Sequence, residues 1–391
     1  MASSLGFWLD KKDSYSNNGN LEINSELHIN YWVLPNEGIN YLDIGVKLTN
    51  KPNTGNIESK IKSIVFYLPF EKKHIEYDSE LGNVVCSDHE LLSAIFNSYV
   101  TETSYITGSG IHSISLPDNK KMKFYTQIDQ ENGDGVKGVK ISELNDKKEK
   151  GVQVTFPMDL FNTELESNVP IYFRFRIKIL DNKAINRISN VTKSKAPTIL
   201  GDFSKIEVID FRINEARNLP YKIRKKVIDF QSINVIHFFL IREATSEFKV
   251  SHSDYKRCRL LETELWDKYL GLKDTKSQKL IYHWKQKTVG NISDDNEDCD
   301  SKSELFINHF SAFAKFSSNT IPKRAAVIVL LLSIIIGIAS GLATNYIWNA
   351  TSSSMLVDEK LQSYDVSIPK PSASNITCSM YWPTPKSENL L

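Results

Sequence analysis

One uncharged stretch constrains this chain more than any other feature of its 391 residues. The run AAVIVLLLSIIIGIASGLATNYIW, residues 325–348, contains no charged side chain, although the mean hydropathy of the whole chain is −0.31. A helix of about 20 residues crosses a bilayer, whereas the core helices of soluble proteins are usually shorter and interrupted by charges. We therefore predict a transmembrane helix over residues 323–348, with Pro322 just before its start.

Basic residues gather on the N-terminal side of this run. Lys323 and Arg324 lie directly before it, whereas Lys360 is the first basic residue after it. Because positive residues are retained on the cytoplasmic side of a membrane, we predict a cytoplasmic N-terminal domain in a single-pass membrane protein. The first residues do not combine a basic region with an apolar one, so no signal peptide is expected. Residues 349–391, rich in Ser and Pro, are predicted to be a disordered external tail.

Small residues form a stripe within the predicted membrane helix. Ser333, Gly337 and Gly341 recur at every fourth position, so they share one helix face and allow a second helix to approach closely. We predict association through this face, with another copy of the chain or with another membrane helix. Aromatic and basic flanking residues predict contacts at the membrane interface, namely Phe310, Phe313, Phe316, Lys323, Arg324, Tyr346 and Trp348. A short helix packed on the soluble domain explains the three phenylalanines equally well.

The first half of the chain alternates apolar and polar residues with a period of two. In YLDIGVKLT, residues 41–49, the apolar positions share one face and Asp43, Gly45 and Lys47 share the other. Similar segments, separated by turn residues, occur at residues 25–34, 61–70, 152–156 and 171–180. These short strands predict an antiparallel β-sandwich-like domain over residues 1–214. The predicted fold class is mainly β, followed by a smaller α-rich segment and one transmembrane helix.

The pattern changes after residue 214. Residues 215–290 combine a basic segment, the apolar run INVIHFFLI and a helical pattern that ends at Gly271, so we predict an α-rich or α+β segment. Residues 291–322 start with NISDDNEDCDSKSE, which predicts an acidic linker followed by a juxtamembrane segment.

Charge and motif content exclude several function classes. The formal net charge is +1, which makes nucleic acid an improbable partner. The four cysteines form no C-x-x-C pair, and no G-x-S-x-G, Walker or H-E-x-x-H motif occurs. GDGVKG, residues 133–138, matches a nucleotide-loop pattern, but its flanks favour a hairpin over a helix. No catalytic residue, cofactor or metal ligand is predicted.

Two basic clusters are the candidate anion-binding residues. Arg174, Arg176 and Lys178 share one face of a predicted strand, and Lys222, Arg224, Lys225 and Lys226 form the second cluster. The alternative is that the first cluster is simply the solvated face of its strand.

Together these observations predict a non-enzymatic recognition, sensor or effector module at the membrane, which binds a protein or an anionic ligand. A membrane-tethered enzyme acting on a phosphate-bearing substrate near the basic strand is the alternative, as is a structural subunit of a membrane complex.

Overall fold

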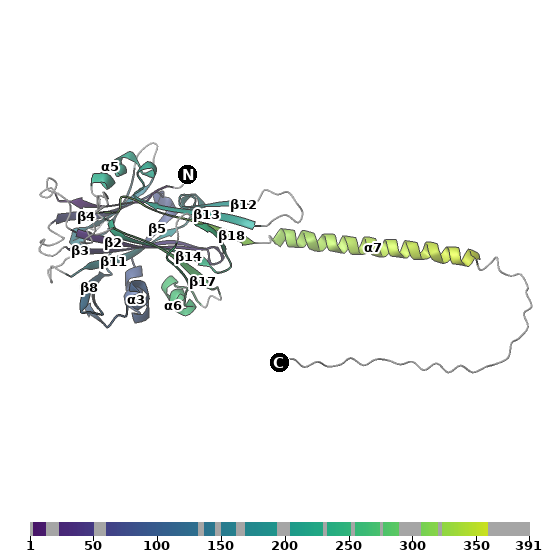
Figure 1. Cartoon of the computed structure of the whole chain (residues 1–391), viewed down its shortest axis with the longest axis horizontal. Helices are drawn as coiled ribbons and strands as arrows, with labels where there is room; N and C mark the ends of the chain where they lie inside the picture. Colours follow the sequence, from purple (N-terminus) through teal and green to yellow (C-terminus); the bar gives the residue numbers. More distant parts are fainter. Residues whose placement is uncertain are drawn as a thin grey trace, which may run out of the picture. The chain divides into compact units, whose positions relative to one another are not determined.

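The computed structural model describes residues 3–12, 23–50, 60–131, 137–144, 150–161, 169–193, 204–229, 233–251, 255–273, 277–288, 306–319 and 323–358. The chain divides into two compact units, Met1–Thr320 and Ile321–Leu391. The first is built mainly of strands and the second contains one long helix (Figure 1). The predicted mainly β fold class is therefore confirmed.

The largest sheet has ten strands. Its order is β16 (Arg257–Leu260), β17 (Lys279–Lys287), β14 (Ile233–Glu243), β2 (Ile23–Leu34), β3 (Ile39–Asn50), β11 (Ile171–Ile179), β8 (Lys120–Tyr125), β7 (Ile111–Leu116) and β6 (Glu102–Ile106), and β5 (Ile75–Asp78) also pairs with β11. The pairs β14–β2 and β11–β8 are parallel and the others are antiparallel. The sheet is thus mainly antiparallel, with two parallel pairs.

Two four-stranded sheets cover one face of this large sheet. The first has the order β1 (Gly6–Lys11), β4 (Ile61–Leu68), β10 (Val152–Pro157) and β9 (Lys140–Glu143). The second has the order β12 (Ser189–Lys193), β13 (Ser204–Ile213), β18 (Phe310–Asn319) and β15 (Glu247–Ser251). All three sheets contribute to one apolar core, in which the predicted inward residues Leu42, Ile44, Val46 and Leu48 are fully buried.

Short helices lie on the outer sides of this sandwich. Helices α2 (Leu81–Cys86), α3 (His89–Phe96) and α6 (Thr263–Leu270) pack on the outer face of the ten-stranded sheet through a second apolar cluster. Helix α5 (Tyr221–Asp229) packs on β1 and β4, on the opposite side of the sandwich (Figure 1). Helix α4 (Asn182–Ile185) follows β11, and single 3-10 turns occur at Pro35–Glu37, Lys72–His74, Met158–Leu160 and Ala216–Asn218.

The boundary expected at residue 214 does not separate two compact units. Residues 215–290 contain α5, α6 and four strands, and β14 pairs along its length with β2 near the start of the chain. This pairing places INVIHFFLI in the middle of the sheet, where Ile236, Phe238 and Leu240 are buried in the core and His237 and Phe239 are half-buried on the outer face. Residues 291–305 lie outside the described residues, and β18 belongs to the sandwich rather than to a juxtamembrane linker.

Helix α7 (Lys323–Asp358) contains an apolar segment, Val327–Ser352, with a mean hydropathy of 2.6 and no burial within the structure. By length and composition this helix can cross a membrane. It continues beyond the predicted end at Trp348, so residues 349–358 are helical rather than disordered. Residues 359–391 lie outside the described part of the chain. Gly337 and Gly341 have open space beside them along this helix.

Candidate anion-binding pocket

Strand register assembles a polar site on the outer face of the ten-stranded sheet. Because side chains alternate along a strand and directly paired residues share a face, pairing fixes which side chains meet. His28 pairs with His237 across β2 and β14, and Glu26 pairs with Lys47 across β2 and β3. His283 of β17 pairs with Phe239 of β14. Residues far apart in the sequence are therefore brought to one surface.

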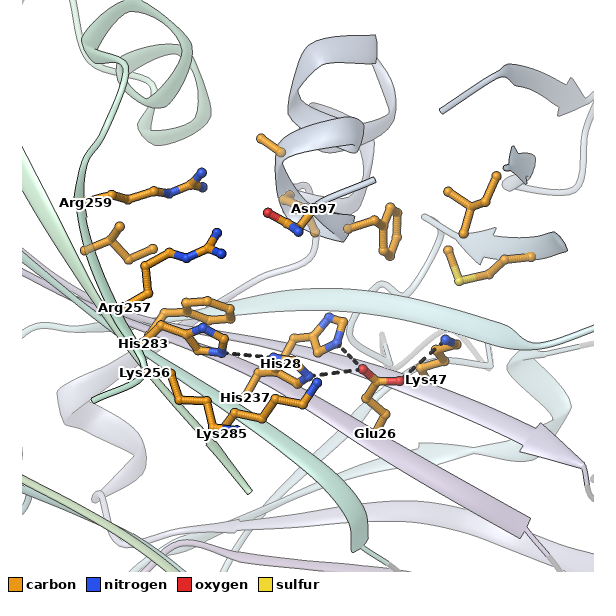
Figure 2. Close-up of a pocket in the computed structure, with 17 residues that line it drawn as sticks. Glu26, His28, Lys47, Asn97, His237, Lys256, Arg257, Arg259, His283 and Lys285 are labelled. Carbon is orange, nitrogen blue, oxygen red and sulfur yellow. Dashed lines mark hydrogen bonds and ion pairs between the residues drawn. The ribbon is translucent and has the colours of Figure 1, made fainter. Parts of the chain in front are cut away.

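This surface forms the floor of a pocket of about 480 Å³ (Figure 2). The end of α3 and strands β16 and β17 supply its walls. Its described lining residues are Glu26, His28, Lys47, Ala94, Ile95, Phe96, Asn97, Leu116, Met122, His237, Phe239, Lys256, Arg257, Arg259, Ile281, His283 and Lys285. A volume of this size accommodates a small organic ligand.

A carboxylate and three imidazoles form a hydrogen-bonded chain on the pocket floor. Glu26 Oε1 lies 3.0 Å from His28 Nε2 and 3.4 Å from His237 Nε2, and His237 Nδ1 lies 3.0 Å from His283 Nε2. An ionised carboxylate only accepts hydrogen bonds, so both Nε2 atoms facing Glu26 carry protons. The other ring nitrogen of His237, Nδ1, is joined by a hydrogen bond to His283 Nε2, whose direction depends on the tautomers of the two rings. Figure 2 shows the three rings converging on this line.

The pKa values of the groups in this hydrogen-bonded chain follow from burial and from these contacts. Burial opposes ionisation of Glu26, but hydrogen bonds from His237 and His28 outweigh it and hold the pKa of Glu26 below its usual range. Burial lowers the pKa of His28, against the opposing effect of Glu26. Burial and the neighbouring His237 lower the pKa of His283 to about 4, and nearby cationic side chains act in the same direction. The site therefore combines an ionised carboxylate with neutral His28 and His283 at pH 7.

Cationic side chains outnumber acidic ones around the pocket. Lys47 is 3.4 Å from Glu26 Oε2, which is the one carboxylate among the described lining residues. The other cations are Lys256, Arg257, Arg259 and Lys285, and none of them has an ion pair with a described carboxylate. A concave surface with this excess of positive charge attracts anions.

One side of the pocket is apolar, with Phe96 at the end of α3, Leu116 and Met122. Phe239 and Ile281 are apolar residues of the strands that form the floor. The ring of Phe239 stacks on His283 with centroids 4.3 Å apart. The pocket therefore has one side suited to a charged group and one side suited to an aromatic or aliphatic group.

A smaller cavity of about 30 Å³ adjoins the pocket beside His28 and reaches Arg174. The Arg174 guanidinium donates to the hydroxyls of Tyr269 and Tyr172, over 3.0 and 3.2 Å, but its buried Nη2 has no partner among the described residues. Gly45 of β3, which pairs with His28, leaves space for the Tyr172 hydroxyl that accepts from Arg174, because a Cβ at Gly45 would collide with that hydroxyl. One member of the predicted basic stripe thus lies behind the pocket.

The expectation that the stripe on β11 is exposed to solvent is wrong for its two arginines. Arg174 and Arg176 are 1% and 5% exposed, because α6 covers this face of the sheet. Arg176 makes two hydrogen bonds to Asp43, of 2.7 and 3.1 Å. Lys178 is 2.7 Å from Glu76 and 3.6 Å from Asp78. The charges of Arg176 and Lys178 are therefore satisfied within the protein.

The second predicted cluster lies on α5, on the opposite side of the sandwich from α3 and α6 (Figure 1). Lys222, Lys225 and Lys226 are exposed and Arg224 is half-buried. Lys226 lies 3.6 Å from Asp10 and above the ring of Trp8. Anion binding by this cluster stays a prediction.

The membrane-interface prediction is wrong for two phenylalanines. Phe310 and Phe316 are buried in the sandwich core on β18, and Phe313 is half-buried on the alternate face. Their spacing reflects a strand paired with β13 rather than a helix on the membrane. Tyr346 and Trp348 are exposed on α7, and the side chains of Lys323 and Arg324 lie outside the described part of the structure. Interfacial roles of these four residues stay predictions.

Sequence reasoning missed the pocket because its residues are scattered among seven strands and helix α3. Glu26 and His28 alternate with Leu27 and Ile29, which was the available signal that both polar side chains share a face. Nothing in the sequence indicates that this face meets His237 and His283.

Comparison with models of known protein families finds no match, and comparison with curated proteins finds none.

Proposed function

We propose that this protein is a membrane-anchored binding module whose soluble domain takes up a small phosphate-bearing molecule that also has an apolar or aromatic group. The observation that carries this proposal is the excess of cations over the single described carboxylate in the pocket. Arg and Lys side chains are the usual partners of phosphate, and the apolar wall supplies contact area for the rest of the ligand. The partners are thus an anionic ligand and the lipid bilayer.

The test is calorimetric titration of the full chain in uncharged detergent micelles with chelator present, using ATP, pyrophosphate and adenosine as probes. We expect ATP to bind more tightly than pyrophosphate, because both walls then contribute, and adenosine to bind weakly. Replacing Arg257 and Arg259 together by Gln should lower the affinity for ATP about tenfold or more.

The matched control removes two exposed arginines outside the pocket, through Arg187→Gln with Arg217→Gln. This pair should leave ATP binding unchanged. Equal losses in both double variants would show a general charge effect and overturn the pocket, as would the absence of binding by any of the phosphate probes.

The proposed orientation places the soluble domain in the cytoplasm, α7 in the membrane and the C-terminal residues outside. It rests on the length and apolar composition of α7 and on the basic residues before it. Cys258 is exposed, so it reports accessibility of the soluble domain, and Cys378 reports the C-terminal side. An impermeant maleimide should label Cys378 in intact cells and Cys258 only after lysis. The reverse pattern would contradict this orientation.

A membrane-tethered enzyme is the second candidate function. The observation that favours it is the Glu26–His237–His283 chain, since a carboxylate that orients an imidazole is a common arrangement for proton transfer. Release of phosphate from ATP by the full chain, lost in His283→Gln but not in the exposed His89→Gln, would favour this candidate over binding alone.

A further inference from the structure

We propose that Glu26, His28 and His237 bind a divalent transition-metal ion, Zn²⁺ or Fe²⁺. One ligand atom from each residue lies within 4.8 Å of the other two. Two histidines and one carboxylate are the protein ligands of many zinc enzymes and of non-haem iron sites, and each leaves coordination positions open.

The separations between the ligand atoms fit a shared ion. With metal–ligand bonds of about 2.1 Å, neighbouring ligands of a tetrahedral ion lie about 3.4 Å apart. Glu26 Oε1 is 3.0 Å from His28 Nε2 and 3.4 Å from His237 Nε2. The ligand atoms of the two histidines lie within 4.8 Å of each other.

Rigid elements hold the three ligands. Glu26 and His28 are two residues apart on β2, and His237 is the residue of β14 paired with His28. Both strands lie within the ten-stranded sheet, with neighbours on each side. Ligands on such elements keep their geometry without loop ordering, which favours metal affinity.

A supporting contact of the kind found at metal sites is also present. Histidine ligands usually donate the ring N–H that does not face the metal to a fixed acceptor, which orients the ring. His237 Nδ1 lies 3.0 Å from His283 Nε2, so His237 can coordinate through Nε2 and donate through Nδ1. His283 acts as a positioning residue in this arrangement.

The surrounding charge fixes what completes the coordination. Lys47 contacts Glu26 Oε2 and leaves Oε1 to the two imidazoles. A bound dication adds to the positive charge of a pocket already lined by Arg257 and Lys285, so an anionic group is favoured at the open position. That last step rests on the proposed function, whereas the metal site itself does not.

The first experiment removes bound metal from the full chain in micelles with a chelator and then titrates it with Co²⁺, in the absence of phosphate. We expect one equivalent to bind and to give a visible absorption band, strong if the ion is four-coordinate as for Zn²⁺ and weak if it is six-coordinate as for Fe²⁺. Metal analysis of protein purified without chelator identifies the native ion.

Matched variants test the assignment. Glu26→Gln and His237→Gln should each abolish stoichiometric Co²⁺ binding, whereas the exposed His89→Gln should bind normally. Circular dichroism confirms that each variant is folded. No stoichiometric binding to the native chain, or unchanged binding to both folded variants, would overturn the metal site. Because ATP binding is measured with chelator present, failure of the metal site leaves the test of the anion pocket separate.

Discussion

The two faces of the ten-stranded sheet are built from the same strands but have different compositions. On β14, Phe238 points into the core between the sheets, whereas the preceding His237 and the following Phe239 line the pocket. The inner face is mainly apolar and contains one buried ion pair, between Arg242 of β14 and Glu207 of β13. The outer face combines apolar contacts with helices, the buried Arg176–Asp43 pair and an open cationic pocket. The difference teaches that one face supplies most of the burial that stabilises the fold, which leaves the other free for polar groups.

The largest expected effect comes from the buried ion pair on the outer face. Asp43 is fully buried and accepts hydrogen bonds from Arg176, Trp32 and Tyr269, each with a shortest distance of 2.7 Å. Asp43→Ala leaves the Arg176 charge buried without its partner and should lower the free energy of unfolding by about 3–5 kcal/mol. Urea unfolding of the full chain in micelles measures this loss.

A half-exposed pair provides the control for Asp43. Asp210 contacts Arg212 on β13, over 2.7 and 2.9 Å, where both side chains retain water contact. Asp210→Ala should cost about 1 kcal/mol or less. Similar losses in both variants would contradict the structural role assigned to Asp43.

Substitution of two neighbouring phenylalanines, Phe238 and Phe239, allows a direct comparison of the two faces. Phe238 stacks on Phe211 with centroids 4.2 Å apart, so Phe238→Ala should cost about 3–4 kcal/mol of unfolding free energy. Phe239→Ala should cost less, since Phe239 is only half-buried, but it should weaken ATP binding. Paired unfolding and titration curves check both statements. Equal losses of unfolding free energy in the two variants, together with equal affinities for ATP, would contradict the difference between the faces.

Substitution of His283 tests whether this residue of the outer face positions His237 for the proposed metal binding. His283→Leu keeps the three proposed ligands but removes the partner of His237 Nδ1. We expect Co²⁺ affinity to fall about 10- to 100-fold, with a shifted absorption band and stoichiometric binding retained at high Co²⁺. Unchanged affinity and spectrum would show that His283 does not position His237.

The smallest effect is expected outside the sandwich, on α7. Gly337→Ile with Gly341→Ile fills the small-residue stripe and should weaken association of the membrane helix by about 1 kcal/mol, with no change in urea unfolding of the soluble domain. Crosslinking in membranes measures the association, and Leu331→Ile with Leu342→Ile is the control. Association that persists unchanged in the glycine variant would show that the stripe is incidental.

The two faces of the ten-stranded sheet also differ in how much of them could be predicted from the sequence. Alternation identified Leu42, Ile44, Val46 and Leu48 as inward-facing, because burial on one side imposes a period of two on a strand. The same alternation placed Asp43 on the opposite face but could not show that this face is buried there, where a helix more than two hundred residues later in the chain covers it. Local pattern reports which residues share a face, and distant chain segments decide what covers that face.

The site failed to emerge from the sequence on the same physical grounds. Pairing of β14 with β2 is parallel and joins segments that no turn connects, so its register leaves no local trace. The apolar run that became α7 was recognisable because its length and lack of charge are themselves the signal.

The pairing of β2 with β14 also means that β2 gains this partner strand only late in synthesis of the chain. The ribosome makes roughly 200 residues between His28 and His237, which takes on the order of 10–40 s at about 5–20 residues per second. Throughout that interval one edge of β2 has no strand beside it, and such an edge can pair with other nascent chains. The pocket, and the full set of three proposed metal ligands, can assemble only after β14 has emerged, so the proposed binding of ligand and metal would follow late in synthesis.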